Sequence, residues 1–214
     1  MNISRSILVR VVTIVAILFA GLISVNQVSA HTKRSPEALA FHDAMRKLWE
    51  DHITWTRLYI VSAASDLPDK DAAAQRLLQN QDDIGNAIKP FYGEEAGNKL
   101  SLLLRSHILI AAELLQAAKN GDTAGFESAK TRWYENADEI AAFLNAANPK
   151  SWPLDEMKAM MKEHLDLTLA EASARLNGDW NADIAAYENI HTQILDMADM
   201  LSAGIIHQFP KKFK

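Results

Sequence analysis

Apolar residues recur every three or four positions along most of the chain after residue 35, which is the spacing of one face of an α-helix. Few segments alternate apolar and polar residues as a half-buried β-strand does. The pattern predicts an all-α protein of six helices without strands. Ser35 and Pro36 open the first helix as N-cap and first helical residue. The apolar face of the sixth helix is expected to include Ile184, Tyr187 and His191.

A histidine recurs at the same place in three successive parts of this pattern. His52, His107 and His164 lie 55 and 57 residues apart, each midway along an apolar helical face. A turn follows each of them, and then a second helix that carries an acidic residue. A fixed period of this length indicates one supersecondary unit used repeatedly. The three units cover about 36–90, 94–149 and 152–210.

The turns between the helices are short, so each pair of helices is expected to form an antiparallel hairpin. The turn sequences include Asp66-Leu67-Pro68-Asp69, Asn120-Gly121-Asp122 and Asn177-Gly178-Asp179. No Gly/Ser-rich linker separates the units. We therefore predict a single bundle domain over residues 31–214, made of three repeated hairpins.

The first 30 residues have the pattern of an export signal. Arg5 and Arg10 precede an apolar run over 11–25, and Val28-Ser29-Ala30 fits a small-residue cleavage site. The run is shorter than the ~20 residues that span a bilayer. We predict a cleaved signal peptide, with an N-terminal membrane anchor as the alternative. Either way, the protein is expected to be exported to the cell envelope or the extracellular space.

Charge and composition exclude several functions. The chain has 22 Lys and Arg against 27 Asp and Glu, and removal of the signal segment makes the charge −7. Nucleic acid is not an expected partner, because phosphate binding needs clustered basic residues. The absence of cysteine excludes disulfides and thiolate sites. No nucleotide loop or hydrolase motif is present, so an enzyme is the less favoured interpretation.

The recurring histidines are the strongest candidates for a functional site. A buried imidazole needs a hydrogen-bond partner, because burying a polar group without one costs about 2–7 kcal/mol. The recurring acidic residue is the expected partner, in the pairs His52/Asp82, His107/Asp138 and His164/Asp199, or in one shared cluster. Nearby polar residues are further candidates for the lining of the same pocket. The ligand-binding candidates are His52, Thr56, Arg57, Asp82, His107, Asn136, Asp138, His164, Thr168, Glu171 and Asp199.

Two interpretations of these residues remain open. They are either structural His–Asp clamps copied with the repeat, or ligands that converge on one polar centre. In the second case His52, His107 and His164 would be the ligands of a transition metal. The sequence requires no cofactor.

Several segments resemble a bacterial all-helical bundle family of unassigned function, whose members often carry an automatic acetylglutamate kinase label. The resemblance covers roughly Leu48 to Pro210 and includes Leu48-Trp49-Glu50-Asp51-His52, Arg132-Trp133-Tyr134-Glu135-Asn136 and His164-Leu165-Asp166-Leu167-Thr168. The label implies an α/β kinase with a Gly-rich nucleotide loop, and this sequence has neither strands nor that loop. The resemblance therefore implies a fold without a mechanism.

The favoured function is a non-catalytic binding or interaction module in the cell envelope. Its partner would be a small ligand or an envelope protein, with membrane contact only through an uncleaved N-terminal segment. The alternatives are a metal- or cofactor-binding bundle that uses the repeated His and Asp positions, and an enzyme acting on a small polar substrate.

Overall fold

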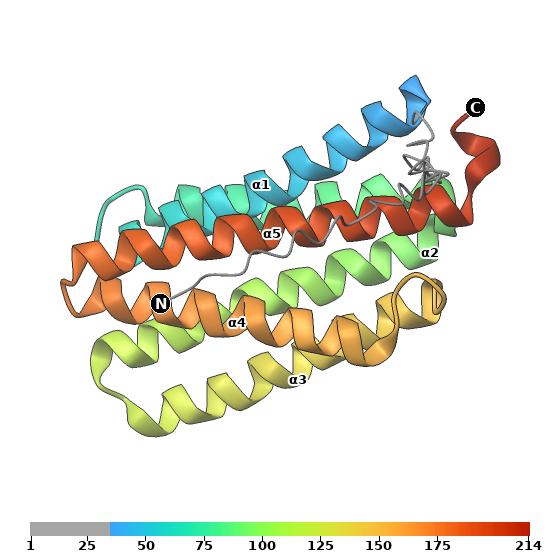
Figure 1. Ribbon diagram of the computed structural model, residues 1–214. Coiled ribbons are helices and arrows are strands. Elements are labelled where there is room, and N and C mark those ends of the chain that lie inside the picture. The colour runs from blue at the N-terminus through green and yellow to red at the C-terminus, as the bar shows by residue number, and fades with distance from the viewer. Residues whose placement is uncertain (1–34) are drawn as a thin grey trace, which may run out of the picture. The chain divides into compact units, whose positions relative to one another are not determined.

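The computed structural model describes residues 35–214, and this part of the chain is helical with no strand (Figure 1). The predicted signal segment lies outside the described residues. The helices are α1 (Pro36–Ala64), α2 (Lys70–Asn120), α3 (Thr123–Ala147), α4 (Leu154–Leu176) and α5 (Trp180–Gln208), followed by the 3₁₀ turn η1 (Pro210–Lys212).

The helix ends follow the expected capping chemistry. The Oγ of Ser35 accepts a hydrogen bond from the N–H of Ala38 at 3.1 Å, and the Ser35 hydroxyl donates to the carbonyl of Phe213 at 2.5 Å. The first bond satisfies an orphan donor of α1, and the second ties the start of the bundle to its C-terminus. Asp122 and Asp179 cap α3 and α5. Gly121 and Gly178 precede these caps with left-handed φ angles of 69° and 73°.

Residues 35–214 form five α-helices where the sequence predicted six, because the predicted second and third helices form the single element α2. Within α2, only Gly93 departs from helical geometry, with φ 87° and ψ 170°. The two arms of α2, residues 70–92 and 94–120, then lie against each other. The hydroxyl of Ser101 donates to the carbonyl of Gln81 at 3.4 Å. One glycine thus reverses the chain without an unwound connector.

The helices form a closed ring. α1 contacts α2 and α5, α2 contacts α3, α3 contacts α4, and α4 contacts α5. Their apolar faces build one main core, which runs from Met45 and Ile53 on α1 to Ile194 and Leu201 on α5. Burying these faces against one another, at about 25 cal/mol per Å² of apolar surface, is the main source of stability in a chain without disulfides.

The first half of α5 does not present the predicted face. Ile184 is exposed, and Tyr187 and His191 are only partly buried. Asp183 and Ile190 point inward instead. The reason is electrostatic: Asp183 is buried because two arginines, Arg57 and Arg175, bind its carboxylate.

Replacing Gly93 by alanine should destabilise the protein by about 1–3 kcal/mol, because its backbone conformation is essentially reserved for glycine. Gly121→Ala is the matched control, since its φ of 69° and ψ of 19° lie in the left-handed helical region that other residues do enter. Chemical denaturation should show the larger loss for Gly93→Ala. Equal stability of Gly93→Ala and the parent chain would contradict this role.

Candidate functional site

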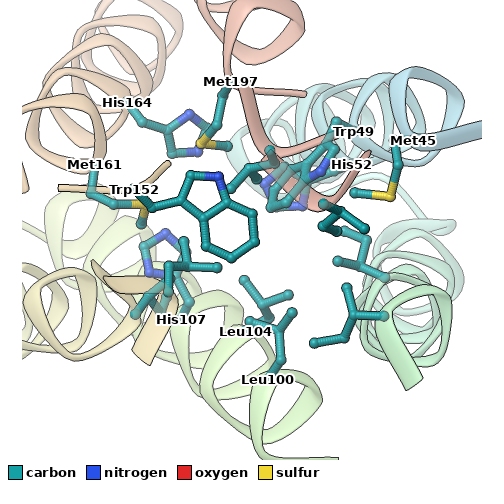
Figure 2. Close-up of a pocket in the computed structure, with 16 residues that line it drawn as sticks. Met45, Trp49, His52, Leu100, Leu104, His107, Trp152, Met161, His164 and Met197 are labelled. Carbon is teal, nitrogen blue, oxygen red and sulfur yellow. The ribbon is translucent and has the colours of Figure 1, made fainter. Parts of the chain in front are cut away.

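The three recurring histidines lie together inside the bundle (Figure 2). His52 comes from α1, His107 from the second arm of α2, and His164 from α4. Their residues are 3%, 4% and 4% exposed. The ring centroids of His52 and His164 are 5.8 Å apart, and those of His107 and His164 are 6.4 Å apart. The predicted convergence of these side chains is therefore present.

Each imidazole forms a hydrogen bond through Nδ1 with a side-chain amide on the next helical segment of the chain. The partners are Gln81 for His52 at 3.2 Å, Asn136 for His107 at 2.9 Å and Gln193 for His164 at 3.2 Å. The separation is 29 residues in all three pairs. The same sequence spacing thus recurs in all three histidine–amide pairs.

A backbone carbonyl orients the amide in two of these pairs. The Nδ2 of Asn136 donates to the carbonyl of Leu103 at 3.2 Å, and the Nε2 of Gln193 donates to the carbonyl of Met160 at 3.2 Å. Leu103 and Met160 each lie four residues before their histidine. The amide oxygen therefore faces the ring and accepts from Nδ1–H. Nε2 of His107 and His164 then carries the lone pair.

The first pair differs. Asn80 binds the equivalent carbonyl, that of Leu48, at 2.9 Å, while the Nε2 of Gln81 donates to the carbonyl of Leu77 at 2.7 Å. The Gln81 amide nitrogen consequently faces His52, whose Nδ1 accepts. His52 then carries its proton on Nε2. The Oε1 of Gln81 is buried and accepts no hydrogen bond from the part of the chain that the structure describes.

The prediction that Asp82, Asp138 and Asp199 pair with the histidines was wrong. Their carboxylates bind Arg105 at 2.9 Å, Lys158 at 2.8 Å and Arg46 at 2.6 Å, each on the next histidine-bearing helix around the ring. All three acidic side chains are partly exposed. A carboxylate at this edge keeps its hydration and a cation, whereas a buried neutral imidazole is matched by a neutral amide without burying charge.

Asn136 was among the sequence candidates, but Gln81 and Gln193 were missed. The signal that could have found them is an amide residue 29 positions after each histidine. Thr56 and Thr168 have a backbone role: their hydroxyls donate to the carbonyls of His52 and His164, both at 2.8 Å.

The imidazoles line an enclosed chamber of about 30 Å³, enough for about two water molecules. Trp152, from the connector between α3 and α4, also lines it and is 2% exposed (Figure 2). The indole N–H of Trp49 is buried and has no hydrogen-bond partner within residues 35–214. The complete lining is Met45, Trp49, His52, Ile84, Ile88, Leu100, Leu104, His107, Ile140, Leu144, Trp152, Met161, His164, Met197, Leu201 and Ile205.

A second cavity of about 40 Å³ is lined by Thr56 and Thr168, which lie four residues after His52 and His164. Apolar side chains such as Leu77 and Leu115 form most of its wall. The indole N–H of Trp133 is buried without a partner among the described residues. Both cavities are therefore largely apolar, and few polar atoms in them are available to a ligand.

Burial keeps the three histidines neutral. It is the main cause that lowers the pKa of His107 to about 3 and that of His164 to about 4. The pKa of His52 is also well below its usual value, because burial and the neighbouring His164 and His107 disfavour its charged form. The chamber thus presents neutral imidazoles at physiological pH.

Arg57 and Glu171, two further candidates, do not line the chamber. They belong to a buried ion-pair network with Asp183, in which the Nη1 of Arg57 lies 2.9 Å from Oε1 of Glu171 and its Nη2 lies 2.8 Å from Oδ2 of Asp183. Burial raises the pKa of Glu171, while Arg57 opposes this shift. Burial also tends to raise the pKa of Asp183, but hydrogen bonds and charge from Arg57 and Arg175 hold that pKa below its usual value.

Among residues 35–214, no three His, Asp or Glu side chains stand in an arrangement ready to hold a metal ion. Comparison of the chain with family models, with curated proteins and with solved structures found no match.

Replacing His107 by leucine should cost about 1–3 kcal/mol of stability, because the buried Asn136 oxygen loses its donor. The double variant His107→Leu/Asn136→Leu should regain most of this loss, since both polar partners are then removed. Urea denaturation of the parent, both single variants and the double variant measures the coupling. Strictly additive effects would show that this hydrogen bond does not couple the two helices.

Stability should fall as the pH drops below 6.5, the ordinary pKa of histidine. The unfolded chain then binds protons that the folded chain, with lowered histidine pKa values, does not bind. At about pH 5 each buried histidine should cost roughly 2 kcal/mol. Denaturation curves from pH 7 to pH 4 measure the slope. The double variant His107→Leu/Asn136→Leu should show a shallower slope, and an identical slope would contradict this assignment.

Proposed function

We propose that this protein is a non-catalytic binding module of the cell envelope, and that it holds a small ligand in the histidine-lined chamber. One observation carries the proposal: Nε2 of His107 and of His164 keeps its lone pair, while Nδ1 of each ring is fixed by an amide. Both rings line the same enclosed space. A purely structural core would gain more from apolar side chains at these positions.

The chamber's chemistry favours binding over catalysis. Its wall offers two imidazole acceptors and the N–H of His52, and every other lining residue among the described ones is an apolar or aromatic side chain or a methionine. Neither a hydroxyl nucleophile nor a carboxylate belongs to the lining. The lowered histidine pKa values also make these rings poor general bases at neutral pH. The envelope location rests on the N-terminal export pattern.

The three-hairpin repeat belongs to the same proposal. Its support is the 29-residue separation of each histidine from its amide and the use of the carbonyl four residues before each histidine. In this view, three copies of one hairpin close into a ring and bring three equivalent histidines to its centre. The ligand site is then a product of the ring closure, since one hairpin supplies only one imidazole.

Filling the chamber should remove the ligand. Leu104→Phe adds volume inside the chamber, and Leu102→Phe on the same helix is the matched control because Leu102 is 62% exposed. Untagged protein from the envelope fraction of the native host should carry a non-covalent mass in native mass spectrometry that disappears on denaturation. The parent and Leu102→Phe should retain it, and Leu104→Phe should lose it. A parent without such a mass, or equal retention in all three chains, would contradict the proposal.

A further inference from the structure

We propose that the ligand of the chamber is a soft monovalent metal ion, Cu(I), bound by Nε2 of His107 and His164 and by a methionine thioether. This inference rests on the proposed function and names its ligand. Three methionines line the same chamber as the imidazoles: Met45, Met161 and Met197. Figure 2 shows Met161 and Met197 near His164. Thioether and imidazole ligands together favour copper over hard cations.

The positions of Met161 and Met197 follow from the helices that carry them. Met161 lies three residues before His164 on α4, which places both on one face. Met197 lies four residues after Gln193 on α5, and Gln193 is the amide that holds His164. Two sulfur ligands thus come from the same two helices that orient one imidazole.

The distance between the two imidazoles suits one shared ion. Two rings that bind one ion at about 2.0 Å per bond have centroids roughly 5 Å apart in a bent arrangement and roughly 6.3 Å apart in a linear one. The centroids of His107 and His164 are 6.4 Å apart. The observed separation matches two rings on nearly opposite sides of one ion, an arrangement that low-coordinate Cu(I) accepts.

The amide contacts provide the outer support that metal-binding histidines need. A ligating imidazole usually donates its other N–H to a carbonyl or carboxylate oxygen, which fixes its tautomer and orientation. Asn136 and Gln193 do this for His107 and His164. His52 is in the opposite tautomer and carries its proton on Nε2, so it is a neighbour of the ion and not a ligand. The site therefore needs two histidines and sulfur, not three histidines.

The uncharged lining of the chamber favours an ion of low charge. All proposed ligands are neutral, and no Asp or Glu lines the chamber. The cost of burying an ion rises steeply with its charge, so an uncompensated divalent ion is disfavoured here. Cu(I) combines a single charge with a preference for soft donors. Hard divalent ions such as Mg²⁺ or Ca²⁺ lack the oxygen ligands they require.

Anaerobic titration of the untagged full chain with Cu(I), in competition with a chromophoric Cu(I) chelator, tests this assignment. The parent should bind one ion per chain. His107→Leu and His164→Leu should each weaken binding at least about 100-fold, and Met161→Leu and Met197→Leu about tenfold. His191→Leu is the matched control, because His191 is an outward-facing histidine that pairs with Glu50, and it should bind as the parent does.

X-ray absorption of the copper-loaded parent gives an answer that does not depend on the folding of any variant. Nitrogen and sulfur scatterers should both surround the ion. Absence of binding, a shell without sulfur, binding that survives both histidine substitutions, or tighter Zn²⁺ binding at the same residues would each overturn the inference. If a bound mass other than copper is lost in Leu104→Phe while Cu(I) does not bind, the proposed function stands and only the metal assignment fails.

Discussion

The hydrogen bond between a buried imidazole and a side-chain amide is the interaction on which the interior of this bundle depends. Without it, His52, His107 and His164 would each place an unpaired polar ring in an apolar core. An amide is a better partner than a carboxylate at this depth, because it satisfies the imidazole without adding charge. It also fixes the ring's tautomer, so that Nε2 of His107 and of His164 keeps its lone pair.

The molecule separates this neutral centre from its buried charges. The ion-pair network of Arg57, Glu171 and Asp183 links α1, α4 and α5 outside the chamber. Its positive and negative groups neutralise one another there. The carboxylates of Asp82, Asp138 and Asp199 lie on the periphery and join neighbouring helices there. Because charge is kept out of the chamber wall, the chamber is suited to a ligand of low charge, which is the physical basis of the copper proposal.

Ring closure turns local pairs into a common site. Each histidine binds an amide on the next helical segment, and this contact alone joins only those two segments. The reversal at Gly93 and the contact between α1 and α5 close the ring, so that the rings of His52 and His107 both approach that of His164. The connector residue Trp152 then packs against Gly204, where a side chain on residue 204 would collide with the indole.

The sequence by itself determined the helical class, the turns and the inward direction of the three histidines, because these follow from the spacing of apolar residues, glycines and caps within short segments. It did not determine the hydrogen-bond partners. Asp138 and Asn136 differ by two positions on α3, and only the rotation of α3 against α2 decides which of them meets His107. The same holds for the inward Asp183, whose burial depends on arginines distant in the sequence. Local pattern sets which face of a helix is apolar, but the partner of a polar group is set by how the faces meet.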